Sequence, residues 1–111
     1  MDASTDRARI ADIAYRTALT VPGVVRLESA PGGAFTTTGP TGEPLEGVSC
    51  AAEAGGGYSV ELRLVTELVP LRPLAERIIA RTRAAAKAVD LGDSLGEIEL
   101  VFADIQVGEP G

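Results

Sequence analysis

The chain has 111 residues, of which 45% are hydrophobic and 4% aromatic, and it carries a formal net charge of -6. This length suits one domain with a core of Val, Leu, Ile and Ala, because two cores would each bury too little surface. The negative charge argues against nucleic acid as a partner. We therefore predict a single domain over residues 1–111.

The sequence contains no recognisable targeting signal. No apolar run approaches the roughly 18 residues that a membrane-spanning helix needs. The N-terminal residues, MDASTDRARIAD, are too polar and charged for a secretory signal. The single cysteine, Cys50, cannot form an internal disulfide. The sequence therefore predicts a cytoplasmic protein.

The first periodic segment covers residues 5–20 and predicts an amphipathic helix. Its inward residues recur at three- and four-residue spacings: Ile10, Ile13, Ala14, Thr17, Ala18 and Val21. Pro22 and Gly23 end this helix. The next residues, VVRLE, alternate and predict a short strand with Val25 and Leu27 on its inner side.

Residues 30–47 contain five glycines and three prolines and have no sustained period. Such a segment cannot keep up a strand ladder, so it predicts a flexible, exposed connection without strands. Long surface insertions cost little entropy, and a tolerated insertion is the simplest interpretation. A functional loop is the alternative.

Two alternating segments follow and predict a β-hairpin. Residues 47–53 and 58–65 are joined by a glycine-rich turn at 54–57. The residues expected to point inward are Val48, Cys50, Ala52, Tyr58, Val60, Leu62 and Leu64.

Residues 71–90 predict a second amphipathic helix. Its apolar arc contains Leu71, Leu74, Ala75, Ile78, Ile79, Thr82, Ala85, Ala86 and Val89. Pro70 and Pro73 suit the opening turn, and Gly92 is placed for a left-handed C-terminal cap. Five of the ten basic residues and two acidic ones lie here, so this segment is net +3 and the rest of the chain net -9.

Residues 96–107 predict a last strand with Ile98, Leu100 and Phe102 inward. Ile105 and Val107 have the opposite parity, which indicates a β-bulge near residues 103–104.

The element order is helix-strand-strand-strand-helix-strand. It predicts an α+β fold, a small, mainly antiparallel sheet with two helices packed on one face. The other sheet face meets water or a partner, and its outward residues are Glu61, Arg63, Glu97 and Glu99.

Catalytic chemistry finds little support in the sequence. There is no histidine, the usual general base and zinc ligand, and one cysteine cannot hold a metal alone. Cys50 alternates with inward neighbours, so we interpret it as core packing. Glu97 and Glu99 share an outward strand face and are better explained as solvated than as an acid–base pair. We predict no enzyme, no cofactor and no metal site.

Three further motifs have structural explanations. Gly39-Pro40-Thr41-Gly42 matches the GxxG clamp of KH-type RNA modules, but it lies between strands and lacks basic neighbours. Residues 55–57, Gly-Gly-Gly, lack the lysine of a phosphate-binding loop and indicate a turn. Asp104, beside the expected bulge, suits a cap or turn.

Three stretches carry a resemblance in their order and spacing: IADIAYRTALTVPGVVRL, YSVELRLVTELVPLRPLAERIIARTRAAAKAV and GEIELVFADIQV. Together they resemble the alkaline shock protein family, the envelope stress response proteins of Gram-positive bacteria, over about 85 of the 111 residues. Two features depart from that family: the segment 30–47 is longer, and Glu67 stands where a glycine commonly follows the third strand. Nine of the ten basic residues are arginine, which favours a GC-rich genome such as an actinobacterial one.

The resemblance implies a small cytoplasmic protein without enzymatic activity that acts in stress tolerance at the inner face of the envelope through protein partners. It also suggests a use for the basic helix, as a surface for a second copy or for a small membrane-anchored protein. The residues expected there are Arg72, Arg77, Ala80, Arg81, Arg83, Ala84, Lys87 and Ala88. Small outward side chains let another backbone approach, and the charged rims can meet an acidic surface.

Three alternatives remain open at this point. The alanines and bases of the helix can simply serve helix formation and solubility. The helix 71–90 can bind anionic membrane directly, although its apolar arc is needed for the core. An RNA-binding module is disfavoured by the net charge.

Overall fold

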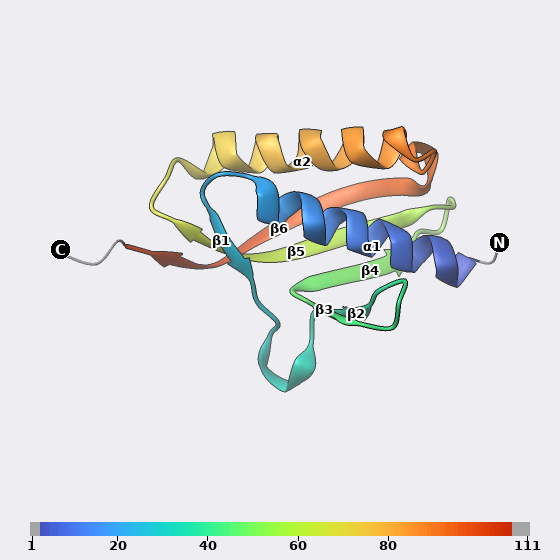
Figure 1. The fold of residues 1–111 in the computed structure, drawn as a ribbon, viewed down its shortest axis with the longest axis horizontal. Coiled ribbons are helices and arrows are strands. Elements are labelled where there is room, and N and C mark those ends of the chain that lie inside the picture. The colour runs from blue at the N-terminus through green and yellow to red at the C-terminus, as the bar shows by residue number, and fades with distance from the viewer. Residues whose placement is uncertain (1–2, 108–111) are drawn as a thin grey trace.

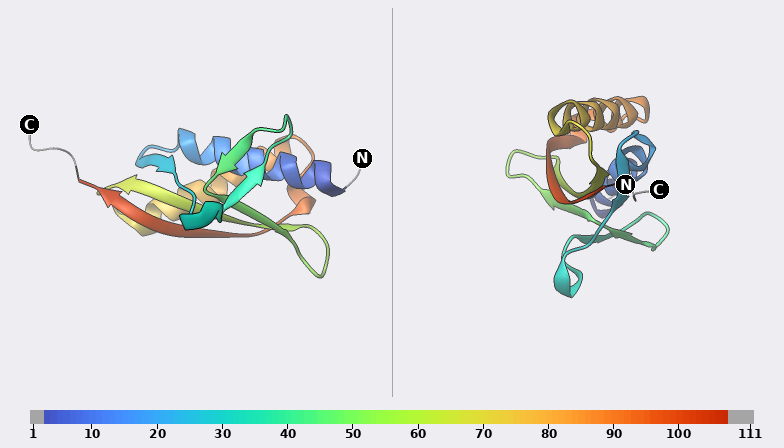
Figure 2. Two further views of the ribbon diagram at one scale, coloured as in Figure 1. Left: turned by 90° about the horizontal axis from the view of Figure 1, so that it is seen from below. Right: turned by 90° about the vertical axis from the view of Figure 1, so that its left-hand side faces the viewer.

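The computed structural model describes residues 3–107, with side chains from Thr5 onward. Its two long helices lie on one face of a sheet, which gives two layers (Figures 1 and 2). The helices are α1 (Ala3–Thr20) and α2 (Leu71–Ala88). The strands are β1 (Val24–Leu27), β2 (Thr36–Thr38), β3 (Pro44–Glu46), β4 (Val48–Ala52), β5 (Tyr58–Glu67) and β6 (Leu95–Gln106). Short 3-10 turns cover Pro31–Gly33 and Gly92–Ser94.

Strand β5 is the centre of the main sheet. β4 pairs antiparallel with its first half and β1 antiparallel with its last residues, so these two strands share one edge. β6 pairs parallel to β5 along the other edge, and α2 is the crossover between them (Figure 1). The predicted α+β fold, with a mainly antiparallel sheet and two helices on one face, is confirmed.

The core lies between the helices and the sheet. In α2 the buried residues follow a strict four-residue spacing: Leu74, Ile78, Thr82 and Ala86. In α1 three fully buried positions are alanines, and because alanine has no bulk beyond Cβ, the helix backbone lies close to its neighbours. β5 contributes Val60, Leu62 and Leu64, all with no exposed surface. The periodicities in the sequence therefore identified the core faces correctly.

Four of the sequence expectations at strand and helix ends were wrong. Ala52 at the end of β4 and Val89 just after α2 are exposed rather than inward. Val25 is exposed rather than inward, because the β1–β5 register shifts between Val24 and Arg26. Helix α2 ends at Ala88, and the left-handed residue after it is Asp90, with φ 60°, instead of Gly92. Aspartate tolerates this conformation better than most residues, since its short side chain can bond locally.

The bulge in the last strand is confirmed. Leu64 pairs with Phe102 and Val65 pairs with Asp104, so Ala103 is the extra residue of β6. Because of this extra residue, Ile105 lies on the same sheet face as Phe102, although the two are three residues apart. Ile105 pairs with Thr66.

Residues 29–46 leave the sheet between β1 and β4 and return to the same place. The Glu28 amide donates to the Arg63 carbonyl (3.0 Å), and the Arg63 amide donates to the Gly47 carbonyl (2.8 Å). Glu28 and Gly47 thus share one position opposite Arg63. We call residues 29–46 the excursion, since the chain before and after it forms one interrupted strand along β5.

The excursion contains regular structure, contrary to the expectation of a connection without strands. β2 and β3 form a two-stranded hairpin, and the Leu45 side chain is buried in the main core. The Thr37 hydroxyl donates to the Val48 carbonyl at 2.7 Å. The buried Leu45 side chain and the Thr37–Val48 hydrogen bond therefore hold the hairpin against the rest of the domain.

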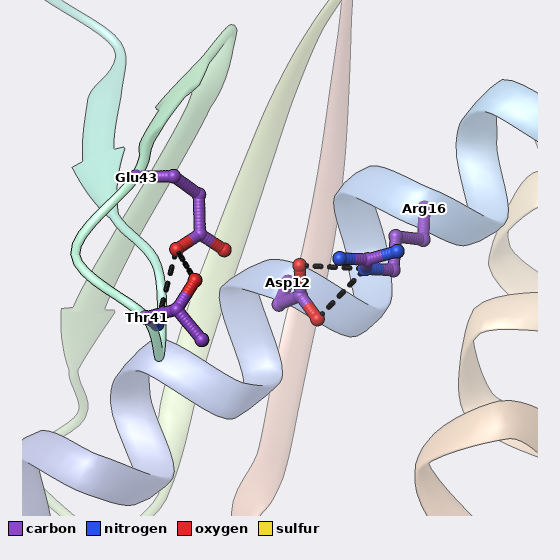
Figure 3. Close-up of polar contacts among 4 residues, drawn as sticks. All are labelled: Asp12, Arg16, Thr41 and Glu43. Atoms are coloured by element: carbon purple, nitrogen blue, oxygen red, sulfur yellow. Dashed lines mark hydrogen bonds and ion pairs between the residues drawn. The ribbon is translucent and has the colours of Figure 1, made fainter.

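The hairpin tip lies beside α1 (Figure 3). There the Thr41 amide donates to the Glu43 carboxylate at 3.0 Å, and the Thr41 hydroxyl donates to the same oxygen. These bonds, with a smaller contribution from the Arg16 charge, hold the pKa of Glu43 below its ordinary value. Arg16 itself pairs with Asp12 at 2.9 Å, one helical turn earlier. The tip is thus braced by its own hydrogen bonds.

Two buried threonines differ in how their hydroxyls are satisfied. The Thr82 hydroxyl donates to the Ile78 carbonyl at 2.8 Å, whereas the fully buried Thr66 hydroxyl has no hydrogen-bond partner among the described residues. Burying an unpaired hydroxyl is unfavourable. We therefore expect Thr66→Val to raise the free energy of unfolding by about 1 kcal/mol in urea denaturation.

Thr82→Val is the matched control for this prediction, and it should give no gain because it removes a made bond. A loss of stability in Thr66→Val would contradict the prediction and indicate that the Thr66 hydroxyl has a partner.

Candidate protein-binding surfaces

All eight residues that the sequence predicted for a binding surface are exposed on α2. They are Arg72, Arg77, Ala80, Arg81, Arg83, Ala84, Lys87 and Ala88. The cause is the buried stripe at four-residue spacing, which turns these positions away from the sheet. We call this set the basic side of α2.

The charges on the basic side of α2 are largely free of internal partners. Arg83 reaches β6, where its Nη2 donates to the Gly96 carbonyl at 3.1 Å. The other four bases make no ion pair or hydrogen bond with any side chain described from residue 5 to 107. A guanidinium is more weakly hydrated than an ammonium and can donate two parallel hydrogen bonds to a carboxylate, so this side suits an acidic surface.

An acidic surface lies on the sheet face that the helices leave uncovered. Glu53, Glu61, Glu97 and Glu99 line a shallow pocket of about 170 Å³. Glu61 pairs directly opposite Glu99 across β5 and β6, an arrangement of like charges that weakens a sheet. We call these four residues the acidic sheet face.

The sequence identified three members of the acidic sheet face and missed Glu53. Glu61, Glu97 and Glu99 occupy outward positions of alternating strands, which the period of two revealed. Glu53 follows the end of β4, and its carboxylate occupies the space that a Cβ on Gly96 would need. The one sequence feature related to the position of Glu53 is the glycine at 96, because a larger residue there would leave no room for the Glu53 carboxylate.

The two charged surfaces lie on opposite sides of the molecule. α2 packs on one face of the sheet (Figure 2). Its bases lie away from the buried stripe that contacts the sheet, while the acidic residues occupy positions on the other sheet face. Opposite charges therefore face away from each other within one copy.

The residues considered for chemistry have structural roles. Cys50 is buried, and this burial raises the pKa of its thiol. Its Sγ lies 3.9 Å from the Arg7 carbonyl. The Asp104 carboxylate accepts a hydrogen bond from the Ile105 amide at 2.8 Å. These contacts agree with core packing for Cys50 and a local bond for Asp104.

The glycine motifs form turns. Gly39 and Gly42 close the β2–β3 hairpin, with the Gly42 amide donating to the Gly39 carbonyl at 3.1 Å. The Glu53 amide donates to the Gly57 carbonyl at 3.0 Å and closes the β4–β5 hairpin. The Gly56 amide donates to the Glu53 carbonyl at 3.0 Å, so each motif contains a hydrogen-bonded turn.

A further pocket lies between α1 and β2. It has about 530 Å³ and is lined by Arg7, by Thr36 to Thr38 and by other small residues. Arg7 is the one charged group in its described lining, which therefore has no acid–base pair. Over residues 5–107, no group of three His, Cys, Asp or Glu side chains is placed to hold a metal ion.

No protein-family model, curated protein or solved structure matches this chain. None of the helices in the described part is both long enough and apolar enough to cross a membrane.

Proposed function

We propose that this protein is a non-enzymatic scaffold whose copies associate head to tail. In this arrangement the basic side of α2 on one copy meets the acidic sheet face of the next. A contact between two different surfaces continues from copy to copy, so the product is an open assembly rather than a closed dimer.

One observation carries the proposal: two unpaired surfaces of opposite charge lie on opposite sides of a small domain. The Glu61–Glu99 pair supports it, because like charges placed opposite each other are relieved when bases from another copy approach. Ala80, Ala84 and Ala88 support it too, since their small side chains let a second backbone come close.

The cellular setting is a second part of the proposal. The resemblance to alkaline shock proteins supports a cytoplasmic role in the envelope stress response, at the inner face of the membrane and through protein partners such as a small membrane-anchored protein. The basic side of α2 exposes alanines between its charges and no aromatic residue, which favours a protein partner over direct insertion into lipid.

Charge reversal tests the head-to-tail contact. One variant, Arg81→Glu with Lys87→Glu, reverses the helix, and another, Glu97→Lys with Glu99→Lys, reverses the sheet. We expect sedimentation velocity to show association of the native protein that weakens with salt. At 0.1 M salt the Debye length is about 10 Å, and exposed charges that lie farther apart than this are largely screened from each other. Each variant alone should associate at least roughly tenfold more weakly.

The equimolar mixture of the two variants is the decisive sample. In it every reversed helix finds a reversed sheet and every native helix a native sheet, so association should return. Arg7→Glu with Arg9→Glu makes the same change of net charge on α1 and should have little effect. A mixture that behaves like its components, or a native protein that stays monomeric at all concentrations, would rule the proposal out.

A further inference from the structure

The exposed apolar residues gather at the end of the molecule where β5 and β6 stop and α2 begins. Leu68 is 70% exposed and Val107 71% exposed, against 37% for Ile105. Thr66 pairs with Ile105 and Glu67 with Gln106, so Leu68 and Val107 each follow the last paired residue of their strand at the same end of the sheet. A contiguous apolar patch of this kind is uncommon on a protein that meets only water.

A pocket of about 360 Å³ lies beside this patch. Three prolines, Pro22, Pro70 and Pro73, line it together with Val69 and Leu74. Because Glu67 and Val69 both line the pocket, the exposed Leu68 stands at its edge. The surface thus presents an apolar projection and an apolar pocket side by side, and the pocket has room for a leucine side chain.

The rim of the pocket has both signs of charge. Glu67 and Arg77 are its charged lining residues, both are exposed, and neither forms an ion pair within the described residues. A two-fold contact that sets Arg77 of one copy against Glu67 of the other makes this ion pair twice. The rim is therefore complementary to itself.

We infer that this end of the molecule is a second contact surface, where two copies join about a two-fold axis with Leu68 of each in the pocket of the other. The occupant is a second copy because projection, pocket and both charges belong to one surface, as a contact of this symmetry requires. The inference rests on the proposed function in that copies of this chain must meet, but it uses the end of the molecule where α2 begins and shares only Arg77 with the basic side of α2. Together, the two contacts would join one open head-to-tail assembly to another.

The test uses the helix-reversed background, Arg81→Glu with Lys87→Glu, in which the head-to-tail contact is weakened. There we expect sedimentation velocity to show a dimer that persists at high salt, because burial of apolar surface is not screened. Leu68→Asp should weaken this dimer roughly tenfold or more, since it removes a central apolar anchor. Val89→Asp is the matched control, at a site 45% exposed near the other end of α2, and should leave the dimer unchanged.

Charge exchange gives an independent test that does not depend on the apolar variant. Glu67→Arg and Arg77→Glu should each weaken the dimer, and the two together should restore it. A monomer at every concentration in this background, or a dimer indifferent to Leu68→Asp, would overturn the inference and leave the pocket to a different protein. The proposed function fails by another result, the mixture of reversed variants that does not associate, so the two are distinguishable.

Discussion

Gly47→Ala is expected to lower the free energy of unfolding by about 3 kcal/mol, a large part of the stability of a domain of this size. Gly47 has φ 89°, a left-handed conformation that disfavours any side chain. A Cβ there would also lie 2.6 Å from the Leu27 Cβ and 2.7 Å from the Glu28 nitrogen. These atoms belong to the point where the excursion leaves the sheet, and the Glu28 nitrogen is held by its bond to Arg63.

Gly56→Ala separates the two causes. Gly56 has φ 97°, but a Cβ there would meet nothing within 4 Å, so this variant suffers backbone strain alone. We expect it to cost about 1 kcal/mol. Urea denaturation of both variants measures the difference. Equal losses would mean that strain accounts for the whole effect and that the chain ends at the junction can move apart.

The core was predictable because each long element repeats one period over many residues. β5 alternates through Val60, Leu62 and Leu64, and α2 repeats Leu74 and Ile78 at four-residue spacing. Consistent patterns of this kind point to one arrangement, and the bulge at Ala103 was readable as a break in such a pattern.

The excursion was harder to predict because its strands are three residues long. No period can be recognised over Thr36–Thr38, and the nearby glycines and prolines favour turns. What holds the hairpin in place is tertiary: Leu45 enters a core made by distant residues, and Thr37 bonds to Val48. Contacts between residues that are distant in the sequence produce no local sequence pattern from which they could be predicted.

The candidate surfaces divide in the same way. The outward position of the basic side of α2 follows from helical spacing within one segment, so the sequence alone predicts that these eight residues are exposed. Glu53 and the pocket beside Leu68 depend on the meeting of separate segments. Pro22 and Pro70, for example, lie side by side only because β1 pairs with the end of β5.

Deletion of residues 29–47 is expected to leave a folded domain. Leu27 pairs with Leu64, Glu28 bonds to Arg63, and Val48 pairs with Leu62. Joining Glu28 directly to Val48 therefore continues one antiparallel strand along β5, with each residue opposite its present partner and on its present face. The loss of the buried Leu45 should cost about 1.5–3 kcal/mol.

A deletion one residue longer, 28–47, should prevent folding. Because the side chains of a strand alternate with a period of two, joining Leu27 to Val48 moves Val48 and Cys50 to the solvent face. Circular dichroism and urea denaturation of the two proteins provide the comparison, and we expect cooperative unfolding in the shorter deletion alone. If both deletions unfolded the domain, the hairpin would be part of its stable core; if both folded, the register across the junction would not matter. Because the shorter deletion retains α2, the acidic sheet face and Leu68, it should also associate like the native protein.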